Sequence, residues 1–290
     1  MRNFSGKVAA VTGAGSGIGR ALAVELATRG CHLALSDVDD AGLAETVAVV
    51  GQAAPIAGSV KVTSAHVDVA DREAVEAWAA DVVEEFGRVN LIFNNAGVAL
   101  SADVGAMSYD NFRWLIDINF WGVVHGTLAF LPHLKTSGDG HVVNISSVFG
   151  LLGIPNQSAY NAAKFAVRGF TDALRTELDI EHCGVSATTI HPGGIRTNIV
   201  RNARFEFAEH GDAVDAEQAA VAFERLTRTT PAKAAQLIIG AVEKNKRRAL
   251  IGPDAHVFDA AARLSPRGSQ WALGKIISRR SAVVTASRTS

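Results

Sequence analysis

The stretch Thr12-Gly13-Ala14-Gly15-Ser16-Gly17-Ile18-Gly19 decides the fold of this chain. It follows the apolar run Lys7–Thr12, which is typical of a buried parallel strand, and leads into the helical spacing of Ile18–Arg29. Its glycines fit the spacing G-x-x-x-G-x-G and not the stricter G-x-G-x-x-G. Glycines let the backbone turn tightly and approach a phosphate, and a helix N-terminus offers free N–H groups. The stretch therefore predicts a pyrophosphate-binding loop between a strand and a helix.

Strand-like and helix-like segments alternate along the rest of the chain. Further strands are expected at His32–Ser36, Val60–His66, Leu91–Phe93, His141–Ile145, Val185–Ile190 and Ala249–Ile251. Helices are expected at Ala41–Ala53 (capped by Asp39 or Asp40), from Asp71 to Phe86, from Ser108 to about Phe130, at Ser158–Glu181 and from Thr230 onward. This alternation predicts an α/β fold in a single domain. Its core is a doubly wound, mostly parallel sheet with helices on both faces, a Rossmann fold whose ligand crevice lies at the carboxyl ends of the strands.

Acidic and small residues follow the next strands at that edge. Asp37 ends the second strand 18 residues beyond Gly19, close to the distance expected for an acid on the adenosine ribose, and a carboxylate there repels a 2′-phosphate. Asp37 therefore favours NAD over NADP, although it could simply begin a turn. The third strand is followed by Asp68-Val69, where Asp68 could meet adenine or cap a helix. The fourth ends in Asn94-Asn95-Ala96-Gly97, where Asn94 could instead hold the sheet together.

Chemistry-bearing residues follow the fifth strand. That strand ends at Ser146-Ser147, and Tyr160 and Lys164 lie four residues apart, on one face of the helix that comes next. A phenol has a pKa of about 10. A nearby ammonium, together with a positively charged nicotinamide, would lower that pKa, so that Tyr160 could exchange a proton near neutral pH. The sequence therefore predicts an acid/base tyrosine beside a nucleotide.

These motifs together resemble those of the short-chain dehydrogenase/reductase family over about residues 5–200. The resemblance rests on Thr12–Gly19, Asp68-Val69, Asn94–Gly97, Asn119, Ser147, Tyr160-x-x-x-Lys164 and Pro192-Gly193-Gly194-Ile195-Arg196-Thr197. It implies a catalytic set of Asn119, Ser147, Tyr160 and Lys164. The expected cofactor is NAD, held by Gly13, Gly15, Ser16, Gly17, Ile18, Gly19, Asp37, Asp68, Val69, Asn95, Ala96, Gly97, Tyr160, Lys164, Pro192, Gly193, Ile195 and Thr197.

The resemblance also implies a role for each catalytic position. Tyr160 would donate or accept the proton, Ser147 would bind the substrate oxygen, and Lys164 would bind the nicotinamide ribose. Asn119 would hold a water that links Lys164 to solvent. The segment Pro192–Thr197 would run alongside the nicotinamide. Relatives of this kind usually pair the helices beginning near Ser108 and Ser158 with those of a second subunit, so a homodimer or homotetramer is expected.

The substrate is expected among apolar side chains. Ser147, Phe149, Leu152 and Tyr160 are the predicted contacts, and Leu151, Ile154, Val98, Ala99 and Leu100 are further candidates, with Asn156 and Gln157 as polar ones. A lid over residues 199–229 would add Phe205, Phe207 and Phe223. Such walls suit a hydrophobic secondary alcohol or ketone, although any one of these side chains could instead pack the lid or a subunit interface. The catalytic domain is expected over residues 1–265, followed by a partly disordered extension over 266–290.

Composition limits the other function classes. The 290 residues carry a net charge of −1, which gives no general attraction to nucleic acid. No apolar run reaches the length of a membrane span, no signal peptide is evident, and a cytoplasmic location is expected. The two cysteines and the histidines show no metal-ligand spacing. The end of the chain is basic; its segment 266–277 could pack on a neighbouring subunit or touch a membrane surface. Two alternatives stay open, an NADP-dependent carbonyl reductase and a catalytically idle NAD(H)-binding regulator.

Overall fold

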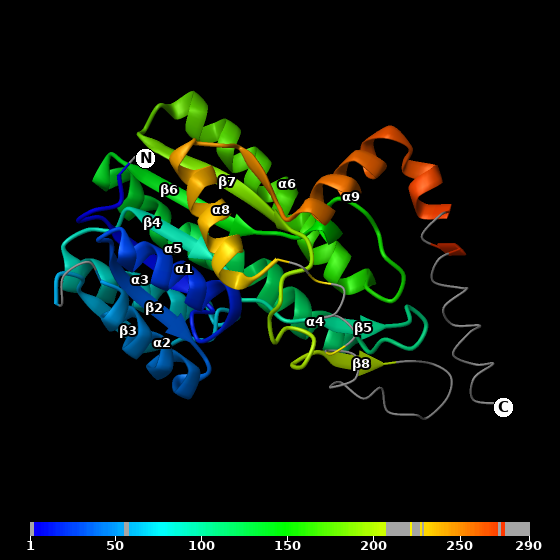
Figure 1. Cartoon of the computed structure of the whole chain (residues 1–290), viewed down its shortest axis with the longest axis horizontal. Helices are drawn as coiled ribbons and strands as arrows, with labels where there is room; N and C mark the ends of the chain where they lie inside the picture. Colours follow the sequence, from blue (N-terminus) through cyan, green and yellow to red (C-terminus); the bar gives the residue numbers. More distant parts are fainter. Residues whose placement is uncertain are drawn as a thin grey trace.

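Seven parallel strands form one twisted sheet in the order β3-β2-β1-β4-β6-β7-β9 (Figure 1). The strands are β1 (Val8–Thr12), β2 (His32–Asp37), β3 (Val62–His66), β4 (Leu91–Asn94), β6 (Gly140–Ile145), β7 (Val185–Pro192) and β9 (Arg248–Ile251). The computed structural model describes residues 3–54, 58–206, 221, 227, 229–271 and 274–275. The strand order reverses between β1 and β4, which creates the crevice where such sheets bind ligands.

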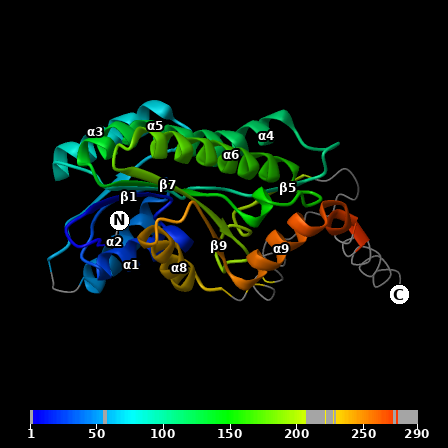
Figure 2. The same cartoon turned by 90° about the horizontal axis from the view of Figure 1, so that it is seen from above.

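Helices cover both faces of the sheet (Figure 2). One face carries α1 (Gly17–Thr28), α2 (Asp40–Ala53) and α8 (Pro231–Glu243), and the other carries α3 (Arg72–Phe86), α5 (Gly122–Ser137) and α6 (Ser158–Glu181). Alternate residues of β1 enter two separate cores: Ala9 and Val11 pack toward α1, while Val8 and Ala10 pack toward α3 and α5. The central strands β1, β4 and β6 are buried along their whole length, as expected for parallel strands covered by helices on both faces. The predicted doubly wound parallel sheet is confirmed.

The helix ends follow local sequence signals. Asp39 caps α2 by accepting a hydrogen bond from Gly42 N, so that of the two candidate caps Asp39 is the cap and Asp40 is the first helical residue. Asp71 likewise caps α3, which ends at Gly87 in a left-handed conformation. These caps satisfy N–H groups that a helix leaves unpaired at its start.

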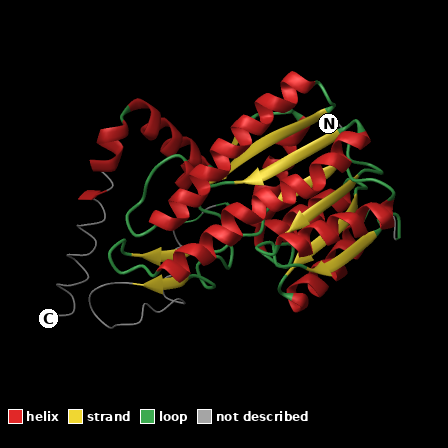
Figure 3. Ribbon diagram, turned by 180° about the vertical axis from the view of Figure 1, so that it is seen from behind, coloured by secondary structure: helices red, strands yellow, loops and turns green. Residues whose placement is uncertain are grey.

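Several elements differ from the predicted pattern. The single helix expected from Ser108 to about Phe130 is α4 (Tyr109–Ile116), a π-helical turn η1 (Asp117–Trp121) and α5, which runs on to Ser137. A short parallel pair, β5 (Leu100–Ala102) with β8 (Arg204–Glu206), lies apart from the main sheet near α4 (Figure 3). A further helix, α9 (Pro253–Leu264), follows β9.

The predicted lid and extension are described only in part. Of the lid over 199–229, the structure describes residues 199–206, 221, 227 and 229; Phe207 and Phe223 lie outside the described residues. Of the extension over 266–290, it describes residues 266–271 and 274–275, so the expectation of disorder at residues 281–290 lies outside them as well.

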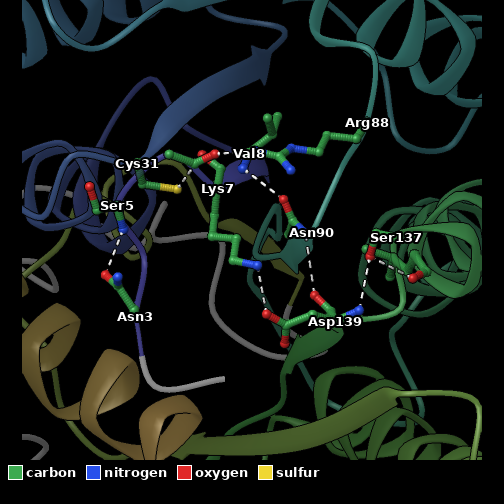
Figure 4. Close-up of polar contacts among 11 residues, drawn as sticks. Asn3, Ser5, Lys7, Val8, Cys31, Arg88, Asn90, Ser137 and Asp139 are labelled. Atoms are coloured by element: carbon green, nitrogen blue, oxygen red, sulfur yellow. Dashed lines mark hydrogen bonds and ion pairs between the residues drawn. The ribbon is translucent and has the colours of Figure 1, made fainter.

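Hydrogen bonds and an ion pair made by side chains connect neighbouring segments at the amino-terminal edge of the sheet (Figure 4). Asn90 Oδ1 accepts a hydrogen bond from Val8 N at 3.1 Å, and Lys7 pairs with Asp139 at 2.7 Å. Cys31 is a buried free thiol that donates to Lys7 O, and burial raises its pKa to about 12. A thiol with so high a pKa is a poor nucleophile. The polar contacts at this edge are therefore structural. The residues predicted to bind cofactor or substrate lie at the opposite, carboxyl-terminal edge.

One helical stretch, Tyr109–Ser137, is long and apolar enough to span a membrane by length and composition, and 44% of its most apolar window is buried in the protein. Phe130 and Leu134 are fully buried and pack in the core beneath α3. These two side chains belong to the helical cover of the sheet.

Candidate active site

The glycine-rich loop joins β1 to α1 in a conformation that requires glycine. Gly13 and Gly17 have positive φ values of 65° and 54°, which L-residues with a side chain rarely adopt. A Cβ on Gly19 would lie 2.0 Å from the carbonyl oxygen of Gly13, and one on Gly13 would lie 2.7 Å from Ala96 Cα. The loop backbone therefore packs against the end of β4 with no room for side chains.

The N-terminus of α1 is open to an anion. Ser16 stands at the N-cap position, yet its side chain makes no capping bond to the described residues, in contrast to the caps of α2 and α3. The first N–H groups of a helix carry partial positive charge and need acceptors. This arrangement fits a pyrophosphate, as the loop sequence predicts.

Asp37 connects the loop to β2. Its Oδ2 accepts a hydrogen bond from Gly15 N at 2.7 Å, and its Oδ1 accepts one from Asp39 N at 3.0 Å. Asp37 therefore begins a turn with Asp39, which was the alternative to a role in binding the ribose. Its other carboxylate oxygen also fixes the backbone of the glycine-rich loop at Gly15. Arg20, which sequence reasoning missed, donates to Gly15 O and to Glu45. The charge of Arg20 is thus already matched by a carboxylate.

The segments after β3 and β4 lie at the same edge. Asp68 Oδ1 accepts from Ala70 N at 2.9 Å, so Asp68 shapes the turn before α3 while Asp71 caps the helix. Asn94 Nδ2 donates a hydrogen bond to Asn144 Oδ1 at 2.8 Å and so links the neighbouring strands β4 and β6. Of the two roles expected for Asn94, this is the one that holds the sheet together.

Asn95 connects the end of β4 to the glycine-rich loop. Its amide donates to Thr12 O at 2.9 Å and to Gly13 O at 3.1 Å. Thr12 Oγ1 in turn accepts from the backbone N–H groups of Asn95 and Ala96. The backbone at Asn95–Gly97 is thereby fixed next to the loop.

Ser147, Tyr160 and Lys164 meet at the carboxyl end of β6. Ser147 follows β6, and Tyr160 and Lys164 project from α6. The Ser147 hydroxyl, which accepts a hydrogen bond from Phe149 N at 3.1 Å, is near enough to the Tyr160 phenol to lower its pKa. Lys164 Nζ lies 5.5 Å from the centroid of the Tyr160 ring and donates to Ile145 O at 3.1 Å. The structure thus brings together three of the four predicted catalytic residues.

Burial dominates the protonation of this group. Burial raises the pKa of Tyr160 to about 12, which the hydrogen bond with Ser147 only partly offsets. Burial also lowers the pKa of Lys164 to about 8. Among the chain's own groups, the Lys164 ammonium does not bring the pKa of Tyr160 below its usual value. The lowering by this ammonium together with a bound, positively charged nicotinamide stays a prediction. The phenolate loses more hydration than Ser147 restores, and the Lys164 ammonium contacts a carbonyl and not the phenol oxygen.

Asn119, the fourth predicted catalytic residue, lies in the π-helical turn. It is fully buried, and its side chain forms two 2.8 Å hydrogen bonds with the backbone N–H and C=O of Val98. A π turn places one extra residue in the helix and often marks a functional site. A Cβ on Gly97 would lie 3.0 Å from Asn119 Oδ1 and 3.6 Å from Lys164 Nζ. Asn119 and Lys164 therefore approach each other across Gly97.

Asn161 is a positioning residue that sequence reasoning missed. Its Nδ2 donates to Phe149 O at 2.7 Å and to Leu152 O at 2.9 Å, and its Oδ1 accepts from Ile154 N at 3.0 Å. The segment that carries the predicted substrate contacts is thus tied to the residue next to Tyr160. Phe149 presents its ring edge-on to Tyr160, with centroids 5.9 Å apart. The available signal was a polar residue on the buried face of α6.

The segment Pro192–Thr197 is held by the last part of the chain. Gly194 N donates to Asp254 Oδ2 at 2.6 Å, and Ile195 forms a parallel β-bridge with Thr229. A Cβ on Gly17 would lie 3.1 Å from Thr197 Cγ2, so the segment reaches back to the glycine-rich loop. Asp254, in the first turn of α9, was also missed, because α9 was not predicted.

Known proteins are similar to this chain in sequence. Residues 7–206 match the family model described as short chain dehydrogenase. The "Putative oxidoreductase SadH" of Mycobacterium tuberculosis is 49% identical over 265 residues, which are 91% of this chain and 92% of that protein. The "Levodione reductase" of Leifsonia aquatica is 36% identical over 231 residues, which are 79% of this chain and 82% of that protein.

Solved structures agree on the fold. A short-chain dehydrogenase/reductase from Burkholderia phymatum, solved in complex with NAD, has a TM-score of 0.81 and 33% identity; the match covers 91% of this chain and 94% of that one. An alcohol dehydrogenase from Thermococcus sibiricus, complexed with 5-hydroxy-NADP, has a TM-score of 0.69 and 27% identity, over 84% of this chain and 95% of that one.

Proposed function

Because the chain belongs to the short-chain dehydrogenase family and is an oxidoreductase, we propose that it transfers a hydride between NAD and a hydrophobic secondary alcohol or ketone, with Tyr160 as acid/base. One observation carries this proposal. Ser147 at the end of β6 and Tyr160 on α6, with Lys164 Nζ 5.5 Å from the centre of the phenol ring, lie at the same sheet edge as the glycine-rich loop.

The residues around the loop support NAD as the cofactor. Gly13, Gly17 and Gly19 let the loop backbone turn tightly against its neighbours, next to the open N-terminus of α1 that would receive a pyrophosphate. The carboxylate of Asp37 beside Gly15 disfavours a 2′-phosphate, and Arg20 already pairs with Glu45. Bound NAD supplies the hydride acceptor or donor.

The chain's own residues handle the proton and the substrate oxygen. Tyr160 holds its proton at neutral pH and, in reduction, donates it to the oxygen of a ketone. In oxidation Tyr160 must first be a phenolate, which then takes the hydroxyl proton. Its raised pKa opposes both roles unless positive charge from the Lys164 ammonium and from a bound ligand stabilises the phenolate. Ser147 Oγ donates a hydrogen bond to the oxygen as negative charge develops there, which lowers the barrier.

Two measurements test the proposal. Tyr160→Phe should lower kcat by about a hundredfold to ten-thousandfold, as loss of a general acid/base does, while calorimetric NAD affinity stays within about threefold of wild type. The control is Tyr109→Phe, because Tyr109 is exposed on α4. Wild-type turnover in Tyr160→Phe would refute the catalytic assignment. Tight NAD binding without turnover on a panel of alcohols and ketones would favour an idle regulator.

The choice of cofactor is tested separately by comparing kcat/KM for NAD and NADP. Wild type should prefer NAD, and Asp37→Ser should reduce that preference by about tenfold or more, the equivalent of one strong charged contact. The relative solved with 5-hydroxy-NADP makes a carbonyl reductase that uses NADP the second candidate. A preference of the wild type for NADP would decide for that candidate.

Apolar walls support a hydrophobic substrate. Leu151 and Leu152 are buried beside Ser147, and Phe149 covers one side of Tyr160. A graded series of alcohols, from small diols to sterol-like rings, should show kcat/KM rising with apolar size. Flat or falling values across the series would contradict this lining as the substrate wall.

We also propose that the chain pairs with a second copy through α5 and α6. Trp121, Leu128 and Phe165 are exposed apolar side chains on η1, α5 and α6. Light scattering should give a dimer or tetramer for wild type, and Leu128→Glu should dissociate it. A monomeric wild type would contradict the pairing.

A further inference from the structure

The C-terminal arm, defined as α9 together with the described residues 266–271 and 274–275, follows β9 and projects away from the body of the protein (Figures 1 and 2). The arm exposes large apolar side chains: Leu264 is 87% exposed, Val257 68% and Trp271 64%. Val257 and Leu264 lie two turns apart and so share one face of α9. Among the described residues, nothing covers this face.

The positive charge of the arm lies in its distal part. Residues 260–275 contain Arg263, Arg267 and Lys275 and no aspartate or glutamate, whereas Asp254 and Asp259 lie in the first two turns of α9. Asp259 itself is shared between Arg248 and Arg263. No acidic side chain in the described part of the chain pairs with the exposed Arg267. The distal part of the arm therefore carries a local positive charge in a protein whose net charge is −1.

Exposed tryptophan, leucine and basic residues on one element match the chemistry of an anionic lipid surface. Apolar side chains insert at the level of the headgroups, tryptophan prefers that interface, and lysine and arginine contact the phosphates. Lys275 Nζ lies 4.1 Å from the centroid of the Trp271 ring, which puts one cation and one interfacial aromatic side by side. We propose that the arm docks this protein on an anionic membrane surface.

The arm begins next to the catalytic group. Asp254, in its first turn, bonds Gly194 of the Pro192–Thr197 segment, and α9 also contacts the turn η2 (Val148–Gly150) after Ser147. Docking therefore holds the mouth of the proposed site close to the lipid phase, from which a hydrophobic alcohol or ketone could enter. This last step rests on the proposed function; the docking itself does not.

Vesicle flotation of the full chain tests the docking without any measurement of turnover. The chain should float with vesicles of phosphatidylcholine and phosphatidylglycerol in equal parts, stay in solution with phosphatidylcholine alone, and be released by salt because salt screens exposed charges. The double variant Leu264→Ser, Trp271→Ser should lower the partition coefficient at least about tenfold. Arg267→Gln should lower it about fivefold, the effect of one basic residue near an anionic surface.

Matched controls separate docking from general stickiness. Tyr109→Ser removes an exposed aromatic from α4, and Arg72→Gln removes an exposed cation from α3; both should float as wild type does. Circular dichroism melts of each variant check that it is folded. Three results would overturn the proposal: no flotation of wild type, equal binding to neutral vesicles, or an arm variant that floats as well as wild type. Dissociation of an oligomer by the double variant, without flotation of wild type, would assign the face to a second copy.

Discussion

Replacing Lys164 with methionine is expected to stabilise the protein at neutral pH while abolishing turnover. Burial lowers the pKa of Lys164 from its ordinary 10.5 to about 8. At pH values below both of these pKa values, the difference destabilises the folded protein by about 3 kcal/mol, because the charged form of Lys164 is disfavoured in the folded state. Methionine is similar in shape and uncharged, but it leaves Ile145 O without the Nζ donor, a loss of about 1 kcal/mol. The variant should therefore be more stable by about 2 kcal/mol.

The sign of the pH dependence follows from the lowered pKa. Between about pH 8 and pH 10.5, Lys164 is protonated in the unfolded wild type and largely neutral in the folded one. The unfolded state then binds more protons, so wild-type stability rises with pH. The advantage of Lys164→Met should shrink by about 2 kcal/mol between about pH 7 and about pH 9.5. Urea unfolding followed by circular dichroism at the two pH values measures it.

Lys135→Met is the matched control. Lys135 is exposed, and its hydrogen bond with Glu181 raises its pKa. A raised lysine pKa contributes stability that is fully present at any pH below the pKa of the unfolded state. The free energy of unfolding of Lys135→Met should therefore differ from that of wild type by the same amount at both pH values. A Lys164→Met protein less stable than wild type at about pH 7, or an advantage that does not change with pH, would refute the reasoning.

Two further predictions concern the loop and the substrate segment. Gly19→Ala should lower NAD affinity at least about tenfold in calorimetric titration, because the new Cβ would lie 2.0 Å from Gly13 O. Gly169→Ala, where a Cβ meets nothing within 4 Å on helix α6, should bind NAD normally and gain about 1 kcal/mol of stability; equal NAD affinity in both variants would contradict the packing of the loop. Asn161→Leu removes three hydrogen bonds and should cost about 2 to 3 kcal/mol in urea unfolding and raise KM for the ketone more than KM for NAD. Asn161→Asp keeps the acceptor for Ile154 N and should lose less, and an unchanged ketone KM in Asn161→Leu would show that this segment does not shape the substrate site.

Elements with strong local signals were predictable from the sequence. The run from β1 through the glycine-rich loop into α1 combines a buried strand with an obligatory turn, and Asp71 and Gly87 mark the two ends of α3. The sequence also predicts that Ser147 approaches Tyr160. In a parallel sheet of this kind, the carboxyl end of a strand and the start of the helix that follows it lie at the same sheet edge.

Other features depend on contacts that no local pattern encodes. A π turn at Asn119 interrupts no apolar period, so the sequence predicted one continuous helix there. The strands β5 and β8 are three residues each and pair across about a hundred residues of chain. The raised pKa of Tyr160 comes from burial, which only the packed site creates. Asn161 bonds backbone groups, so its polar character on the buried face of α6 is visible in the sequence but its partners are not.

The bond between Gly194 N and Asp254 has a consequence for the order of synthesis. The glycine-rich loop and β1 emerge from the ribosome first, and domains begin to acquire structure from the N-terminus. The Pro192–Thr197 segment gains this partner only after β9 and the start of α9 have left the exit tunnel. A chain released just after Ile251 would therefore carry every predicted catalytic side chain and still lack the fixed backbone beside them. The nascent protein should acquire its nucleotide loop early and complete its active site among its last steps.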